Sequence, residues 1–252
     1  MSRPSLCVYT VLFSVGEPKA NSYVRMFMTW LGCIIRHAKL GRDDRLVIIA
    51  DEVTGKYLKS EMSLDGVGSL LKCRCDILQM PPVKSLKDGM MWKYTPFQYT
   101  QDILLYLDVD VLVMRPLEGF QVGKLYLHKE GDWSHVLYGA GGEGPGFSAG
   151  KWACGSQEIR KWLLEGVWRR SQQDKQEYYT IEQPLFNHAV REMQGHWDMT
   201  LLSSPVVCSN GTGFDKHKTM LLDLCGTPGD GAFHENKMVT IFNYLWAKGD
   251  LD

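Results

Sequence analysis

One stretch of the chain constrains its fold more than any other: residues 103–113 read Ile-Leu-Leu-Tyr-Leu-Asp-Val-Asp-Val-Leu-Val. A run this apolar predicts a strand buried on both faces, as at the centre of an α/β sheet. Two carboxylates, Asp108 and Asp110, interrupt it one residue apart. Burying unpaired carboxylates is costly, so the pair needs a compensating partner.

A divalent cation that carries a nucleotide diphosphate would be such a partner. Oxygen ligands at a strand end suit Mn²⁺ or Mg²⁺, which commonly bridge carboxylates to phosphate oxygens. The alternative is that the strand ends at Leu107 and that both aspartates are solvated loop residues.

The pattern of apolar residues before this stretch predicts alternating strands and helices. The segments that predict strands are 6–13, 45–50 and 73–79, and those that predict helices are 21–37 and 54–64. This order is typical of a parallel sheet with crossover helices, in which ligands bind at the carboxyl ends of the strands. We therefore expect an α/β fold with a mostly parallel central sheet and helices on both faces.

A length of 252 residues fits one such domain over 1–252. We divide it into a nucleotide-binding half at approximately 1–115 and an acceptor and sugar half at 116–252. The second half is less regular. A glycine-rich tract at 139–146 predicts a loop that could serve as a lid, and residues 156–170 predict an amphipathic helix.

The composition and charge of the chain argue against several classes of partner and location. The net charge is −1 and the basic residues are scattered, which argues against nucleic acid or a membrane surface as a partner. The sequence has no apolar run long enough to span a membrane, and its first residues lack the features of a signal peptide. Seven cysteines, an odd number, indicate reduced thiols. We therefore expect a cytoplasmic protein.

Five segments, in this order, resemble motifs of one enzyme family. They are Met-Trp-Lys-Tyr-Thr-Pro-Phe at 91–97, the Asp-x-Asp run at 103–113, Gly-Phe-Ser-Ala-Gly at 146–150, Glu-Gln-Pro-Leu-Phe-Asn at 182–187 and Phe-His-Glu-Asn-Lys at 233–237. The family is that of nucleotide-sugar glycosyltransferases of the GT-A fold, and the likeness is greatest to the glycogenin-like family, glycosyltransferase family eight. The resemblance implies a single GT-A, Rossmann-like domain.

The resemblance also implies an activity. It predicts a metal-dependent enzyme that transfers a sugar, with retention, from a UDP-sugar to a hydroxyl of a carbohydrate or protein-linked glycan. Asp108, Asp110 and His234 would bind the Mn²⁺ or Mg²⁺ ion. Lys93 would stabilise the leaving group and Gln183 would line the site beside the anomeric carbon.

The resemblance assigns substrate binding to residues from four of the five segments and from the first predicted strand. They are Thr10, Asp108, Ser148, Ala149, Gly150, Glu182, Asn187 and Lys237. The sequence departs from the family at Ser148, where Asn is usual, and at Glu182, where Asp is usual. It also departs after His234, where a glycine is missing and the lysine follows after only three residues.

Several of these residues have plain structural alternatives. Lys93 could be a solvated lysine at a helix start, His234 a structural histidine, and Thr10 a strand threonine. The protein could also be a sugar- or nucleotide-binding module without turnover. A nucleotidyltransferase is a weaker alternative, because 15–19 is a poor phosphate-binding loop. An inverting enzyme would need a general base, for which Glu143 and Asp132 are candidates.

Overall fold

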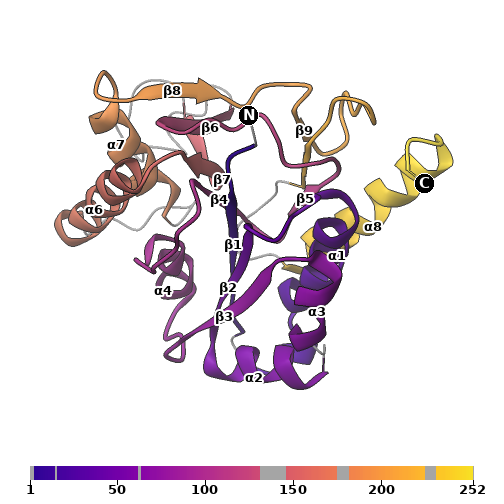
Figure 1. Cartoon of the computed structure of the whole chain (residues 1–252). Helices are drawn as coiled ribbons and strands as arrows, with labels where there is room; N and C mark the ends of the chain where they lie inside the picture. Colours follow the sequence, from indigo (N-terminus) through magenta and orange to yellow (C-terminus); the bar gives the residue numbers. More distant parts are fainter. Residues whose placement is uncertain are drawn as a thin grey trace.

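Four strands run parallel at the centre of the structure and continue into an antiparallel pair (Figure 1). The structure is a computed structural model that describes residues 3–14, 16–61, 64–130, 146–174, 182–224 and 231–251. The central sheet has the order β3-β2-β1-β4-β7-β6-β8. Its strands are β1 Leu6–Leu12, β2 Arg45–Asp51, β3 Arg74–Met80, β4 Ile103–Leu107, β6 Lys124–Glu130, β7 Gly146–Cys154 and β8 Asp198–Leu201. A smaller sheet has the order β5-β10-β9, with β5 at Val111–Val113, β10 at Leu221–Asp223 and β9 at Val207–Ser209.

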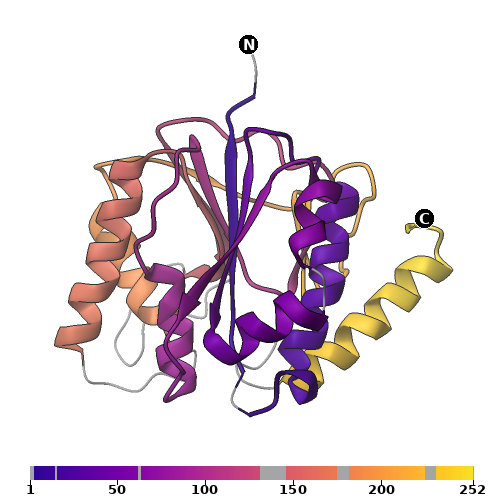
Figure 2. The ribbon, with the colours of Figure 1, turned by 60° about the horizontal axis from the view of Figure 1, so that its bottom comes forward.

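Helices cover both faces of the central sheet (Figure 2). Helices α4, α6 and α7 lie on one face, and α1, α3 and α8 lie on the other. The α-helices are α1 Ser22–His37, α2 Glu52–Glu61, α3 Leu64–Leu71, α4 Leu86–Met91, α6 Gln157–Gln173, α7 Gln183–Met193 and α8 Gly231–Ala247, and the 3₁₀ helices are η1 Pro18–Ala20 and η2 Trp92–Tyr94. This confirms the predicted α/β class, with a mostly parallel sheet between two helical layers.

Alternation along each strand builds two hydrophobic cores. In β1, Val8 packs into the core that holds Trp30 of α1, whereas Tyr9 packs into the core that holds Trp152 of β7. Successive side chains of a strand point to opposite faces, so one apolar strand serves both cores. Both tryptophans are fully buried, and burial of roughly 150–250 Å² each at about 25 cal/mol per Å² favours folding by several kcal/mol.

Two predicted elements need correction. The single helix expected at 54–64 is the helix α2, which begins at Glu52, followed by the separate helix α3. The apolar run 103–113 is two strands in two different sheets, β4 and β5, with the Asp-x-Asp pair in the turn between them. The predicted strand therefore ends at Leu107.

The parallel strands give the sheet two chemically different edges. We call the ends of β1–β4 the carboxyl edge and their first residues the amino edge. Asp108 follows β4 at the carboxyl edge, and Arg45 and Arg74 begin β2 and β3 at the amino edge. The described part of the chain contains no helix that combines the length and apolarity needed to span a membrane.

Candidate active site

The Asp-x-Asp turn is fixed to the neighbouring strand by its backbone. The amide of Asp108 donates to the carbonyl of Gly150 at 2.8 Å, and the amide of Val111 donates back to the carbonyl of Asp108 at 3.0 Å. The side chains of Asp108 and Asp110 are 27% and 17% exposed. The strand therefore ends as the alternative predicted, but the two aspartates are half-buried rather than solvated.

A buried lysine lies beside the first aspartate. Lys93, on η2, is 1% exposed, and its Nζ lies 2.6 Å from Oε1 of Glu182 and 3.5 Å from Oδ1 of Asp108. It also donates to the carbonyl of Ala149 at 3.4 Å. Burial alone would lower the pKa of Lys93, but the carboxylates of Asp108 and Glu182 outweigh it, so its pKa is raised. Lys93 is therefore a buried cation and not a solvated lysine.

A second buried lysine, which no sequence motif had indicated, lies on the other side of the site. Lys151 of β7 is 1% exposed, and its Nζ lies 2.7 Å from Oδ2 of Asp223 and 3.4 Å from Oε1 of Glu130. It also donates to the hydroxyl of Ser148 at 2.9 Å. Burial would raise the pKa of Glu130, but Lys151 outweighs it and the pKa is lowered. Glu130 therefore stays ionised beside the site.

Asp223 brings a third carboxylate to the Asp-x-Asp turn. It pairs with Val111 in the register of β10 and β5, and the next amide, of Leu224, donates to the carbonyl of Asp110 at 2.9 Å. Burial raises the pKa of Asp110, and the negative charges of Asp108 and Asp223 raise it further. The signal for Asp223 was present in the sequence, since Met-Leu-Leu-Asp-Leu at 220–224 is again an apolar run with one carboxylate.

The predicted third metal ligand contacts one of the two aspartates, Asp110. His234, near the start of α8, is buried, and its Nδ1 lies 3.1 Å from Oδ2 of Asp110. An ion pair between Arg25 of α1 and Glu235, with 2.6 Å between nitrogen and oxygen, ties this end of α8 in place. Lys237 stands with its Nζ over the ring of Phe233, 4.8 Å from the ring centroid.

The first half of β7, residues 147–150, is held by two side chains of α7 and is strand rather than a turn. The side chain of Asn187 accepts from the amide of Phe147 at 2.6 Å and donates to its carbonyl at 2.8 Å. Asn187 is fully buried, so its amide positions this part of the strand. Gln183 accepts from the amide of Ala149 at 3.1 Å, and its Nε2 lies 3.4 Å from Oε2 of Glu130.

Gly150 has a steric reason to lack a side chain. A Cβ at this position would lie 2.6 Å from Oδ2 of Asp108. The glycine therefore lets the carboxylate of the Asp-x-Asp turn lie directly against β7.

Other predicted residues are placed differently or lie outside the described residues. Thr10 is fully buried within β1, and its hydroxyl has no hydrogen-bond partner among the described residues. It exposes nothing that a nucleotide base could contact in this conformation. The predicted lid, except for its last residue Gly146, and both candidate general bases, Glu143 and Asp132, lie outside the described residues.

The donor set fits a divalent cation in its chemistry. Five carboxyl groups, those of Asp108, Asp110, Glu130, Glu182 and Asp223, lie at the site with two lysines, and when all are ionised they exceed the lysines by three charges. Burial raises the pKa of Asp110 and of Glu182, so a bound cation would favour their ionised forms. Carboxylate oxygen and imidazole nitrogen are ligands that Mn²⁺ accepts. No group of three such side chains has already converged on one point in the described ranges. Asp108, Asp110 and His234 are the residues that would hold the ion.

Comparison of the sequence with protein-family models and with curated proteins gave no match.

Proposed function

We propose that the protein is a metal-dependent glycosyltransferase that transfers a sugar from a UDP-sugar to a hydroxyl acceptor with retention. One observation carries the proposal. The carboxyl edge of a mostly parallel sheet, where such folds bind ligands, gathers an Asp-x-Asp turn, a buried histidine and two buried lysines around an excess of negative charge. The motif resemblance supplies the substrate class.

Asp108, Asp110 and His234 would bind Mn²⁺ or Mg²⁺ and, through it, the diphosphate. The bound ion would supply charge stabilisation to the departing phosphate. Lys93 holds a positive charge beside Asp108, where it can attract the diphosphate and limit the repulsion between carboxylates.

The sugar would be held by Glu182 and by the segment 147–150 of β7. Oε1 of Glu182 is bonded to Lys93, while Oε2 is buried without a hydrogen-bond partner among the described residues. An unpaired buried carboxylate oxygen is costly, and a sugar hydroxyl would satisfy it. Lys93 thus orients Glu182 and leaves one oxygen for the donor.

Gln183, which the resemblance assigns to the region beside the anomeric carbon, lies next to Glu130. The two side chains are 3.4 Å apart, and Glu130 is 30% exposed on its side chain. Glu130 is the described carboxylate that could compete with our assignment of retention, because an ionised carboxylate can act as a general base. In the retaining mechanism its role is to orient Gln183 and bind an acceptor hydroxyl.

The metal assignment is tested by calorimetry of UDP binding. UDP should bind much more tightly with Mn²⁺ than with EDTA, and Asp110→Ala should abolish the difference. Asp198→Ala is the matched control, because that side chain is 65% exposed on β8. Equal affinity for UDP with and without metal in the unaltered protein would show the proposal to be wrong.

The role of His234 is tested against its neighbour in the same helix. His234→Ala should weaken Mn²⁺-dependent UDP binding more than Lys237→Ala, because His234 contacts Asp110 and Lys237 stacks on Phe233. Unchanged metal affinity in His234→Ala would leave the histidine with a structural role only.

Stereochemistry is tested by NMR of the first product formed. Retention predicts an α-linked product from an α-linked UDP-sugar, with Gln183→Ala losing much of the transfer rate. Glu130→Gln keeps the side-chain shape and should retain measurable transfer. A β-linked product, with no transfer in Glu130→Gln, would identify Glu130 as the base of an inverting enzyme.

One observation favours a second candidate, a sugar- or nucleotide-binding module without turnover. Both lysines at the site are already paired with protein carboxylates, Lys93 with Glu182 and Lys151 with Asp223. Metal-dependent UDP binding without transfer or hydrolysis of any UDP-, GDP- or dTDP-sugar would favour this candidate.

We further propose a carbohydrate or protein-linked glycan as acceptor and a cytoplasmic location. The location is supported by the cysteines, since the six that are described, at 7, 33, 73, 75, 154 and 208, are free thiols.

A further inference from the structure

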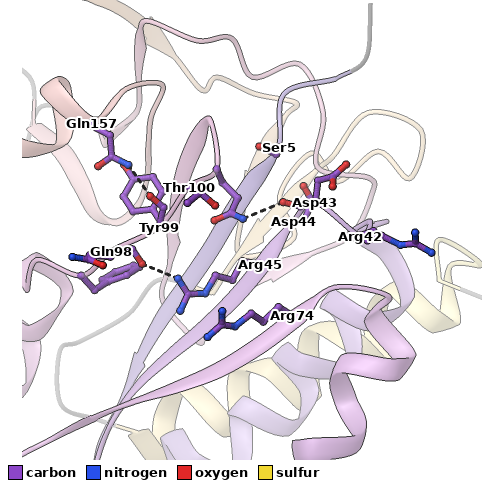
Figure 3. A pocket seen from close by; sticks show the side chains of 12 residues that line it. Ser5, Arg42, Asp43, Asp44, Arg45, Arg74, Gln98, Tyr99, Thr100 and Gln157 are labelled. Atoms are coloured by element: carbon purple, nitrogen blue, oxygen red, sulfur yellow. Dashed lines mark hydrogen bonds between the residues drawn. The ribbon is translucent and has the colours of Figure 1, made fainter.

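The amino edge of the central sheet carries a polar hollow, at the opposite end of the parallel strands from the Asp-x-Asp turn. Its volume is about 870 Å³. The walls come from residues 42–45, the start of β3, residues 97–101 and the first residue of α6 (Figure 3). None of its lining residues belongs to the candidate active site.

Two arginines form the floor of this hollow. Arg45 and Arg74 begin the parallel strands β2 and β3 and are direct neighbours in their register. Like charges opposite each other on neighbouring strands repel, and one carboxylate, Asp76, lies between them. Asp76 accepts from Nε of Arg45 at 2.7 Å and from Nε of Arg74 at 2.9 Å. The carboxylate of Asp76 thus pairs with both guanidinium groups.

The orientation of the two guanidinium groups determines which nitrogens could bind a ligand. Both groups contact Asp76 through Nε, so their terminal nitrogens are left for other partners. Nη1 of Arg45 donates to the carbonyl of Gln98 at 2.7 Å, and the terminal nitrogens of Arg74 make no hydrogen bond to the described residues. Arg45 and Arg74 extend in the same direction, whereas Arg42 extends away from them (Figure 3). The pair is therefore a preorganised donor surface with one unbalanced positive charge.

Neutral polar side chains line the wall beside these donors. Gln98, Thr100 and Gln157 are exposed there. Two acidic residues also line the hollow, and neither lies beside the arginine pair. Asp43 is exposed and lies on the same side as Arg42 (Figure 3). Asp44 is buried and bonded to the amides of Leu6 and Gly41 and to Arg3.

We propose that this hollow binds a phosphate monoester of a polyhydroxylated small molecule, such as a hexose phosphate. The terminal nitrogens of Arg45 and Arg74 would hold the phosphate, because guanidinium groups match phosphate oxygens in geometry and charge. The amides and the hydroxyl on the wall would bind the hydroxyls of the remainder. The site is independent of the proposed transferase activity.

Calorimetry with a hexose 6-phosphate, inorganic phosphate and the uncharged hexose tests the proposal, with saturating UDP present to occupy the other edge. The hexose phosphate should bind, inorganic phosphate more weakly, and the hexose undetectably. Arg74→Ala should weaken binding about tenfold or more, as expected for lost hydrogen bonds to a charged group. Arg42→Ala is the matched control and should change the affinity less than about twofold.

Arg74 is a suitable probe because its side chain is 71% exposed and Asp76 keeps Arg45 as a partner when Arg74 is removed. Thr100→Val is a second variant and should weaken the hexose phosphate but not inorganic phosphate. Absence of binding, equal affinity in Arg74→Ala, or equal affinity for inorganic phosphate and the hexose phosphate would each overturn the proposal. A separate titration of each variant with UDP and Mn²⁺ reports on the transferase site, so failure of one proposal can be told from failure of the other.

Discussion

The two edges of the central sheet differ in how deeply their charged side chains are buried. At the carboxyl edge, Lys93 and Lys151 are each 1% exposed and their closest carboxylates, on Glu182 and Asp223, are also buried. At the amino edge the arginine pair is more exposed, since the side chain of Arg74 is 71% exposed and those of Arg45 and Asp76 are 19% and 25% exposed. Both edges contain ion pairs of similar length.

The difference suits a carboxyl edge whose charged groups serve ligand binding rather than the stability of the fold. A buried ion pair loses much of its Coulomb attraction to the cost of desolvation, and well-packed apolar residues would often be as stable. A surface pair loses little and contributes little. Two buried pairs at one edge are therefore better explained by a ligand that needs them than by the stability of the fold.

The largest predicted effect is a loss of stability when the buried lysine of the carboxyl edge is removed. Lys93→Met removes a buried cation with little change in volume and leaves Glu182 and Asp108 without it. We expect a loss of about 3–5 kcal/mol in the free energy of unfolding, measured by chemical denaturation. The control is Lys56→Met on α2, a 73% exposed lysine paired with Glu52, for which we expect a loss below about 0.5 kcal/mol.

A second substitution distinguishes lost pairing from lost packing. Adding Glu182→Gln to Lys93→Met removes the charge that was left uncompensated, so much of the stability should return. If the double variant were less stable than Lys93→Met, packing rather than charge would account for the loss.

The sequence predicted the parallel part of the fold well, because its signals are local. Strand β1 is a short continuous apolar run and helix α1 shows a clear period of 3.6 residues, and each lies within a residue or two of its predicted bounds. The division into α2, which ends at Glu61, and α3, which begins at Leu64, was missed, since apolar spacing alone does not mark it. The assignment of β5 to a second sheet was also beyond prediction, because it depends on pairing with the distant strand β10.

The site was predicted only in part, for a similar reason. Lys93, Asp108 and Glu182 were selected from motifs and lie together. Glu130 was missed because a bulge between Leu127 and Lys129 shifts the register of β6 against β7. A bulge breaks the alternation of side chains, so the sequence pattern does not show which way Glu130 faces.

The second prediction compares Gly150, in the middle of β7, with Gly155, which directly follows the last residue of that strand. In Gly155→Ala, at the amino edge, the new Cβ would lie 2.4 Å from the carbonyl oxygen of Gln121 and 2.9 Å from two backbone nitrogens. Backbone cannot move aside easily, so we expect a loss of about 1–3 kcal/mol in unfolding free energy. In Gly150→Ala the Cβ meets only the side chain of Asp108, and the loss should stay below about 1 kcal/mol.

For UDP binding we expect the opposite order, with the larger effect in Gly150→Ala. Gly150→Ala displaces the carboxylate of Asp108 and should therefore remove Mn²⁺-dependent UDP binding, whereas Gly155→Ala should bind UDP normally below its melting temperature. Calorimetry at a temperature where both variants are folded makes the comparison. Normal UDP binding in Gly150→Ala would mean that Asp108 does not need its present position.

The smallest predicted effect is at the amino edge and tests the comparison from its other side. Arg74→Ala leaves Asp76 paired with Arg45 at 2.7 Å, and it removes a like charge from the neighbouring strand. The lost attraction to Asp76 and the relieved repulsion from Arg45 oppose each other, so we expect a change of less than about 1 kcal/mol, of either sign. The change should shrink further at high salt, because exposed charges are screened. Denaturation of Arg74→Ala and the unaltered protein at low and high salt measures both quantities. A salt-independent loss as large as that of Lys93→Met would show that the amino edge also depends on its ion pairs, and the contrast between the edges would then fail.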